Sequence, residues 1–270
     1  MSALVLAVLT PAFHYHQFGE ATRMARDAGL SALFTCGSVI AVFGTIRAFR
    51  REIESGTMEM ALAYPISRTG FLLAKAAGAF VAYLGFAAIV LSTVLVIVDG
   101  AAVGGVIAKR TGDIARLWGP CLAVGVAVLV LPPIVAAALN RFGRFRFVLS
   151  AFGVALALSA LAAVLAIIHN GGVVLRLFPA VVAIACLTLV LLAASAAFAV
   201  RLKVNAAVSA VGLVFALLIP AVGNYYLSDA LANGGVVSWG YVGLVALVSL
   251  PPVLLFLLLG AHFINGRDIT

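Results

Sequence analysis

Long uncharged apolar runs alternate with short polar or charged stretches along almost the whole chain. A helix needs about 20 apolar residues to cross the hydrocarbon core of a bilayer, and most of the runs reach that length. The pattern predicts an all-α membrane bundle with about seven full spans, at residues 29–46, 76–98, 117–140, 147–168, 177–200, 204–222 and 239–261. Residues 1–12 are apolar but too short to span, so we interpret them as an N-terminal stub.

The composition agrees with a membrane location. Of the 270 residues, 65% are hydrophobic and 10% are charged, whereas soluble domains contain about 25% charged residues. The mean hydropathy is +1.24. We therefore expect residues 1–270 to form a single transmembrane domain with no substantial soluble part. The net charge of +8 is spread over loops, which indicates membrane topology rather than a nucleic-acid-binding face.

The longest interruption of the apolar pattern is the charged stretch at residues 47–75. Its first part contains Arg47, Arg50, Arg51, Glu52, Glu54 and Glu59. A charge at the centre of a spanning helix costs roughly 2.5–3.5 kcal/mol. We therefore expect this stretch to lie outside the hydrocarbon, as a connection between two spans.

Local signals divide this connection into pieces. Arg50 and Glu54 are oppositely charged and four residues apart, a spacing that favours a short helix. Gly56 can end that helix, because glycine readily takes the left-handed conformation of a helix C-terminus. Pro65 excludes a helix at the preceding residue, and Ser67 is suited to cap a span that begins near residue 69. The sequence predicts a short charged helix, a break, a partly apolar stretch, a proline turn and a new span.

Residues 51–75, REIESGTMEMALAYPISRTGFLLAK, resemble the core of permease subunits of ABC transporters of the type-two exporter family. In that family an R-E-x-E-x-x-T element is followed by P-[IV]-S-R and by a G/A-K pair. The matching positions here are Arg51, Glu52, Glu54, Thr57, Pro65, Ile66, Ser67, Arg68 and Lys75. The resemblance is strong over residues 47–75 and weaker over the rest of the chain.

The resemblance implies that the region 47–70 contains a coupling helix, which docks on a separate cytoplasmic ATPase. It implies ATPase coupling by Arg50, Arg51, Glu52, Glu54, Thr57 and Glu59, and a role at the start of the next span for Pro65, Ser67 and Arg68. It also implies a second permease chain, in a homodimer or a heterodimer. ATP and Mg²⁺ would be bound by the partner ATPase, with no cofactor in this chain. The alternative is a charged inter-helix loop without a partner.

Motifs for chemistry within the chain are missing from the sequence. None of the three lysines follows a glycine, so the G-K-[ST] element of a phosphate-binding loop is absent. Neither H-E-x-x-H nor G-x-S-x-G occurs. We therefore expect a transporter subunit rather than an enzyme. The predicted spans also lack interior acidic residues, which ion-coupled carriers normally need. A secondary carrier or channel without an ATPase, and a non-transporting anchor for a cytoplasmic partner, stay open as alternatives.

The basic residues predict the orientation in the membrane. With the charged stretch in the cytoplasm, the alternating spans place inside Arg47, Arg50, Arg51, Arg68, Lys75, Arg141, Arg144, Arg146, Arg201, Lys203 and Arg267. The outside receives Arg23, Arg26, Lys109, Arg110, Arg116 and Arg176. The excess inside follows the positive-inside rule. We predict a multi-pass protein of the plasma (inner) membrane, in contact with lipid, with a cytoplasmic C-terminus.

Two further features are candidates for function. Pro132-Pro133 and Pro251-Pro252 lie within predicted spans. Proline interrupts helical hydrogen bonding, so these pairs are candidate kinks of a transport pathway, with ordinary kinks as the alternative. His14, His16 and Glu20 lie in a polar segment that we expect outside the membrane. Residues of a membrane-border loop explain them better than a metal site, and we predict no metal.

Overall fold

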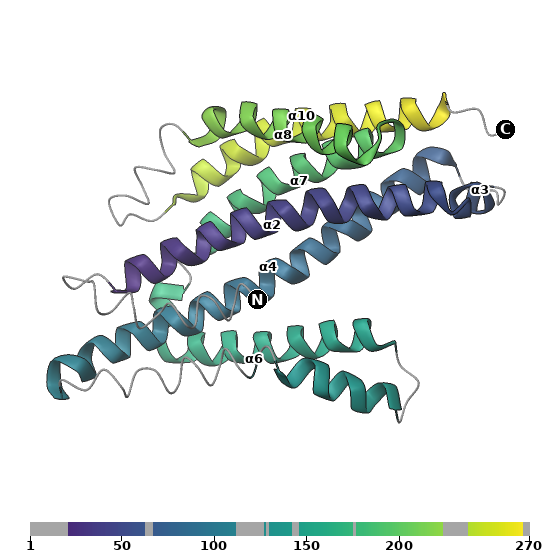
Figure 1. Cartoon of the computed structure of the whole chain (residues 1–270). Coiled ribbons are helices and arrows are strands. Elements are labelled where there is room, and N and C mark those ends of the chain that lie inside the picture. The colour runs from purple at the N-terminus through teal and green to yellow at the C-terminus, as the bar shows by residue number, and fades with distance from the viewer. Residues whose placement is uncertain are drawn as a thin grey trace. The chain divides into compact units, whose positions relative to one another are not determined.

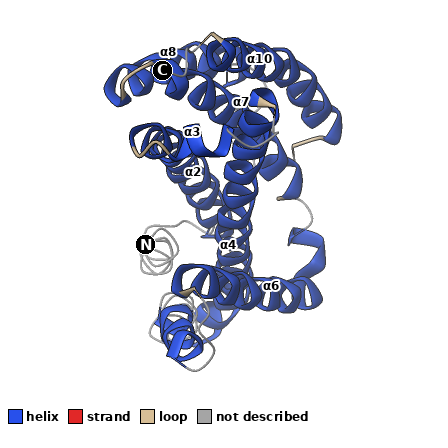
Figure 2. Cartoon of the chain, turned by 90° about the vertical axis from the view of Figure 1, so that its right-hand side faces the viewer, coloured by secondary structure: helices blue, strands red, loops and turns tan. Residues whose placement is uncertain are grey.

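The computed structural model describes residues 21–62, 67–111, 127, 130–141, 146–174, 177–223 and 237–266. Among these residues every regular element is a helix and none is a strand, as Figure 2 shows, which confirms the all-α prediction. The elements in chain order are α2 (Ala21–Glu54), α3 (Thr57–Leu62), α4 (Arg68–Thr111), α6 (Phe147–Val174), α7 (Phe178–Arg201), α8 (Val204–Gly223) and α10 (Trp239–Asn265). A shorter helix, Val130–Arg141, precedes α6.

The chain divides into two compact units, and the helices of each can be followed in Figure 1. Unit 1 contains Met1–Leu33 and Gly85–Phe178, and unit 2 contains Phe34–Leu84 and Pro179–Thr270. The long helices α2 and α4 each contribute residues to both units.

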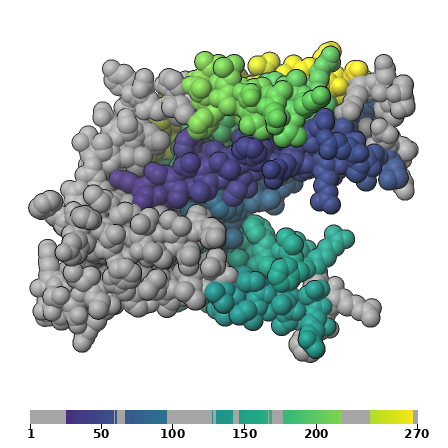
Figure 3. All heavy atoms as spheres, viewed as in Figure 1, coloured from purple at the N-terminus to yellow at the C-terminus, as the bar shows by residue number. Residues whose placement is uncertain are grey.

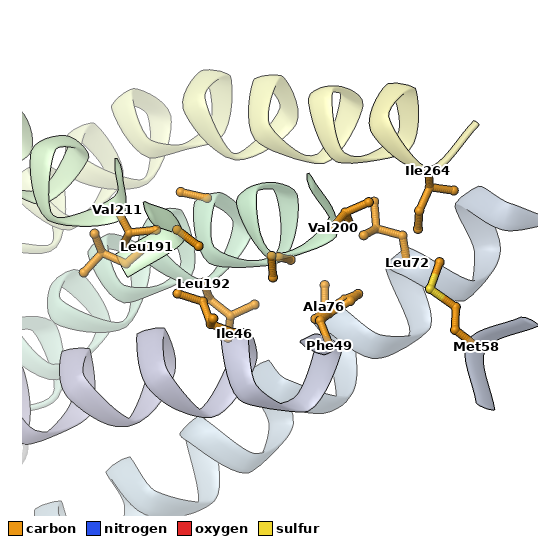
Figure 4. Close-up of a cluster of buried hydrophobic side chains, with 14 residues drawn as sticks. Ile46, Phe49, Met58, Leu72, Ala76, Leu191, Leu192, Val200, Val211 and Ile264 are labelled. Atoms are coloured by element: carbon orange, nitrogen blue, oxygen red, sulfur yellow. The ribbon is translucent and has the colours of Figure 1, made fainter. Parts of the chain in front are cut away.

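Unit 2 is built around α7. A continuous buried stretch of this helix runs from Val190 to Ala197, with large apolar side chains up to Leu192 and only alanines and Ser195 after it. Small side chains let neighbouring helix backbones approach closely. One hydrophobic cluster joins α7 to five other helices of this unit (Figure 4), and its labelled members are Ile46, Phe49, Met58, Leu72, Ala76, Leu191, Leu192, Val200, Val211 and Ile264. The core of unit 2 therefore holds the short helix α3 as well as the long helices.

Aromatic contacts add to the packing of unit 2. The rings of Phe34 on α2 and Phe215 on α8 are stacked at 5.5 Å, and Figure 3 shows these two helices next to each other on the surface. The rings of Phe198 on α7 and Phe256 on α10 meet edge to face at 5.7 Å. Both separations lie in the range of favourable aromatic pairs.

Unit 1 is held by close contacts of glycines with neighbouring helices. In α2, Gly29 faces Val94 of α4, whose side chain occupies the space that a Cβ would need. In the same way Gly85 of α4 faces the ring of Phe152 on α6. Many of the large apolar side chains of α6 are exposed, including Val148, Leu149, Leu161 and Leu165.

Exposed apolar surface is abundant in unit 2 as well. On α10 it includes Leu244, Leu247, Leu250, Leu254, Leu255 and Leu258. Soluble monomers rarely expose apolar patches of this kind, whereas lipid tails cover them without cost. The exposed faces therefore agree with helices that stand in a bilayer.

Within the described residues, five helices are long and apolar enough to cross a membrane: Arg26–Glu54, Arg68–Leu95, Phe147–Leu165, Phe178–Arg201 and Trp239–Asn265. Two shorter apolar helices in the described part of the chain, Val130–Arg141 and Val204–Leu217, fall within the other two predicted spans. The protein is therefore a multi-pass membrane protein, and seven full-length spans stay a prediction. The N-terminal stub lies outside the described residues.

Four predicted helix boundaries are wrong. The predicted loop after residue 98 is helical as far as Thr111, because α4 contains no proline and its glycines weaken a helix without ending it. The helix α6 continues through Gly171 and Gly172 to Val174 for the same reason. In α2 the charged residues 47–54 continue the preceding span, and residues 21–28 are helical rather than a loop.

Candidate functional site

The candidate site is the charged end of unit 2, where α2 ends and α4 begins. In Figure 1 the end of α2, the helix α3, the first turns of α4 and the end of α10 lie together. The contacts described below tie these four segments to one another.

The last two turns of α2 contain the first predicted pair. Nη2 of Arg50 lies 3.0 Å from Oε1 of Glu54, four residues later, and the Glu54 side chain is 63% exposed. The neighbouring Arg47 and Arg51 are also exposed. The Arg51 guanidinium forms no hydrogen bond or ion pair with the described residues.

The break between α2 and α3 lies at Ser55 and Gly56, where the sequence predicts it. Gly56 has a φ of +69°, a conformation that strains residues with a Cβ. The hydroxyl oxygens of Ser55 and Thr57 are 2.8 Å apart. Both hydroxyls reach the carbonyl oxygen of Glu52, at 3.4 and 3.3 Å. They therefore satisfy a carbonyl that the end of the helix leaves without an intrahelical donor.

The helix α3 presents two different faces. Met58 is buried in the hydrophobic cluster, where it anchors α3 to the long helices of unit 2. Met60 on the other side is 65% exposed, and Thr57 is exposed as well. The side chain of Glu59 and the whole of Pro65 lie outside the described residues.

Glu52 has a partner within the chain. Its carboxylate forms an ion pair with the ammonium group of Lys75, 23 residues later on α4, and both side chains are about two-thirds buried. The ammonium group also lies 5.9 Å from the centre of the Phe71 ring. The pair joins the end of α2 to the start of α4 across the break, so Glu52 is not a freely exposed contact of the charged stretch.

Removing this ion pair should weaken the connection between the end of α2 and the start of α4. We expect Glu52→Gln and Lys75→Gln each to lower the free energy of unfolding by about 1 kcal/mol, the upper end for partly exposed pairs. The double variant should lose less than the sum, because the second change removes a charge that is already unpaired. The free energy of unfolding is measured in detergent for the wild type, the two single variants and the double variant. Strictly additive losses of stability would show that the two charges do not interact.

The start of α4 is fixed by Ser67 and Arg68. Oγ of Ser67 accepts a hydrogen bond from the backbone N–H of Gly70 at 3.1 Å, which is the N-cap interaction that the sequence predicts. Nη1 of Arg68 donates to the carbonyl oxygens of Ile264 and Asn265, each at 3.3 Å. Arg68 therefore contacts the last turn of α10, a contact with no signal in the sequence.

Other basic residues of unit 2 lie at helix ends. The guanidinium of Arg201, at the end of α7, lies 5.5 Å from the centre of the Phe263 ring on α10. Lys203 is exposed in the turn between α7 and α8. The predicted orientation of the basic residues stays a prediction, and Arg144 and Arg267 lie outside the described residues.

The two proline pairs lie in different units. Pro251 and Pro252 are inside α10, and Pro132 and Pro133 are in the helix Val130–Arg141. Their role in a transport pathway stays a prediction. Among the described residues no three His, Cys, Asp or Glu side chains are grouped to hold a metal. The segment with His14, His16 and Glu20 lies outside these residues.

Comparison with known proteins identifies the family. The family model described as ABC-2 family transporter protein matches residues 1–157, which is more than half of the 270-residue chain. The match includes the break and the start of α4. No curated protein and no solved structure matched the chain. Together with the apolar helices, the match confirms the resemblance of the charged stretch: the chain belongs to the ABC-2 family of transporter proteins and is a membrane-spanning permease component.

Proposed function

We propose that the chain is the permease subunit of an ATP-driven exporter whose separate ATPase docks on an exposed coupling surface. We define this surface as Arg51, Glu54, Thr57 and Met60. One observation carries the proposal: charged and apolar side chains are exposed together on both sides of a helix break, in a chain of the ABC-2 family. ATP and Mg²⁺ would be bound by the partner ATPase.

The coupling surface has the composition of a protein interface. Arginine and methionine are enriched at interfaces relative to the rest of a protein surface. Arg51 has no described ion-pair partner, and Met60 exposes 65% of its surface. Glu54 pairs through Oε1 with Arg50, four residues earlier, and its side chain is 63% exposed, so it can still accept a hydrogen bond from a partner. These groups suit charge-assisted contacts around one apolar anchor.

The buried side of the same segment supports transmission of movement. Met58 holds α3 in the core, and the Glu52–Lys75 pair links α2 to α4. Closure of an ATPase dimer would displace α3 and shift these helices between two packings, inward-open and outward-open. Two permease chains, in a homodimer or a heterodimer, would form the pathway in the plasma (inner) membrane. The coupling surface and the C-terminus would face the cytoplasm.

Reconstitution into proteoliposomes tests the proposal. The probes are ethidium and a fluorescent phospholipid, because the apolar interior suits amphipathic cargo. We expect ATP hydrolysis with the purified permease–ATPase complex and none with the chain alone. An imposed proton or sodium gradient should move neither probe. Movement of either probe by the chain alone under such a gradient would contradict the proposal and establish a secondary carrier.

A further inference from the structure

Arg68 connects two segments that are 196 residues apart. Its guanidinium donates to the carbonyl oxygens of Ile264 and Asn265, which belong to the last turn of α10, where the helical hydrogen-bond ladder ends. The positive charge also complements the negative end of the α10 dipole. The first residue of α4 thus caps the last helix.

One helical turn after Arg68, α4 is also packed tightly against α10. Leu72 of α4 is fully buried, and its Cδ2 lies 3.0 Å from where a Cβ on Gly260 would be. The Cα of Ala197 on α7 lies 3.2 Å from the same point. The first turns of α4 and the last turns of α10 therefore lie against each other without intervening space, and they must move together.

Pro251 and Pro252 divide α10 above this contact. They lack backbone N–H groups, so the carbonyls of Leu247 and Val248 lose their helical hydrogen bonds. Kinks of helices occur at such positions. The segment from Val253 to Asn265 can therefore tilt relative to the first half of α10.

We propose that Arg68 is a positioning residue. It transmits displacement of the coupling surface to α10, and Pro251 and Pro252 form the hinge at which α10 bends. The coupling surface spans the break at Ser55–Gly56, and α4 begins at Arg68, shortly after it in the chain. The docked ATPase would therefore displace α3 and, with it, the start of α4. The displacement passes from α4 through Arg68 to the inner half of α10, which bends against its outer half. The role of Arg68 rests on the proposed function, because the ATPase supplies the displacement.

The test measures bending of α10 in the permease–ATPase complex. Spin labels are placed at Leu244→Cys and Leu258→Cys, two exposed positions on either side of the proline pair, after Cys36, Cys121 and Cys186 are replaced by Ala. The labels are 14 residues apart, or about 21 Å along a helix. Electron spin resonance compares their distance distribution without nucleotide and with trapped ATP. The wild-type background should show a shift of a few ångströms.

Four variants test whether the shift in the distance between the labels depends on Arg68. Arg68→Gln should lose the shift, and Arg68→Lys should keep most of it, because an ammonium group can still donate to the same carbonyls. Pro251→Ala with Pro252→Ala should lose it as well, since a continuous helix resists bending. Lys203→Gln removes an exposed charge at the turn between α7 and α8, and it should behave as wild type.

Two results would overturn the role of Arg68, and they are distinguishable. An undiminished shift in Arg68→Gln would show that the movement reaches α10 by another route, with the proposed function intact. The absence of any nucleotide-dependent shift in the wild-type background overturns the hinge. If ATP hydrolysis by the complex is also absent, the proposed function fails with it. Size-exclusion profiles and melting temperatures establish that each variant is folded.

Discussion

Gly260→Val is expected to lower the free energy of unfolding by about 3 kcal/mol, the upper part of the usual range for overpacked cores. A Cβ at this position would lie 3.0 Å from Leu72 Cδ2 and 3.2 Å from Ala197 Cα. Leu72 is fully buried and the Ala197 atom is backbone, so neither has room to withdraw. The helices α4, α7 and α10 would have to separate. Thermal unfolding in detergent should show a clearly lower melting temperature.

Gly243→Val is the matched control on the same helix. A Cβ on Gly243 would meet nothing within 4 Å, and replacing a helical glycine removes a penalty of up to about 1 kcal/mol. This variant should therefore be as stable as wild type or slightly more stable. Equal melting temperatures for the two valine variants would show that the three helices do not meet at Gly260.

The double variant Arg51→Ala with Glu54→Ala should uncouple ATP hydrolysis from transport. Both side chains are exposed on the coupling surface. Truncating one partner of a hydrogen-bonded charge pair that binding buries costs about 2 kcal/mol or more, which is about 30-fold in affinity. Transport by the reconstituted complex should fall at least tenfold. Initial rates of probe movement and of phosphate release, measured on the same vesicles, give the coupling ratio.

Stability provides the control for this loss. The Arg50–Glu54 pair is four residues apart on an exposed helix face, and such pairs contribute about 0.3–0.5 kcal/mol. The double variant should therefore melt within a few degrees of wild type. Lys203→Ala with Asn205→Ala, two exposed positions around the start of α8, should transport normally. Unchanged transport in the Arg51/Glu54 variant would remove the coupling role from this surface.

The local structure of the charged stretch could be predicted because it depends on spacing. The Arg50–Glu54 pair follows from the helical repeat, and the cap by Ser67 follows from a hydroxyl before an apolar run. Gly56 is at the break because its left-handed φ excludes other residues. Each of these features involves residues within four positions of one another.

The contacts between helices could not be predicted, because they depend on how the helices pack. The sequence analysis assigned Glu52 to the ATPase interface together with Arg51. That role stays a prediction. The structure adds an ion pair between Glu52 and Lys75, which the sequence does not indicate, because several cations lie near Glu52 along the chain. The contact of Arg68 with Ile264 and Asn265 joins opposite ends of the chain and uses backbone oxygens, which no side-chain pattern marks.

The helix boundaries show a third kind of difference. Charges at residues 47–54 cannot lie in hydrocarbon, and the sequence analysis therefore separated them from the preceding span. No proline or glycine occurs between Arg47 and Glu54, so α2 simply continues beyond the membrane. A polar segment marks where the bilayer ends, whereas only a stop signal such as Gly56 marks where the helix ends.

Purification of the chain from its native membrane under mild detergent tests the central claim most directly. The claim predicts that a soluble ATPase co-purifies in a stoichiometric ratio and is lost from the Arg51→Ala/Glu54→Ala variant. The variant with Lys203→Ala and Asn205→Ala should retain it. A homogeneous preparation without any ATPase, from an intact membrane fraction, would contradict the claim that this chain is driven by ATP.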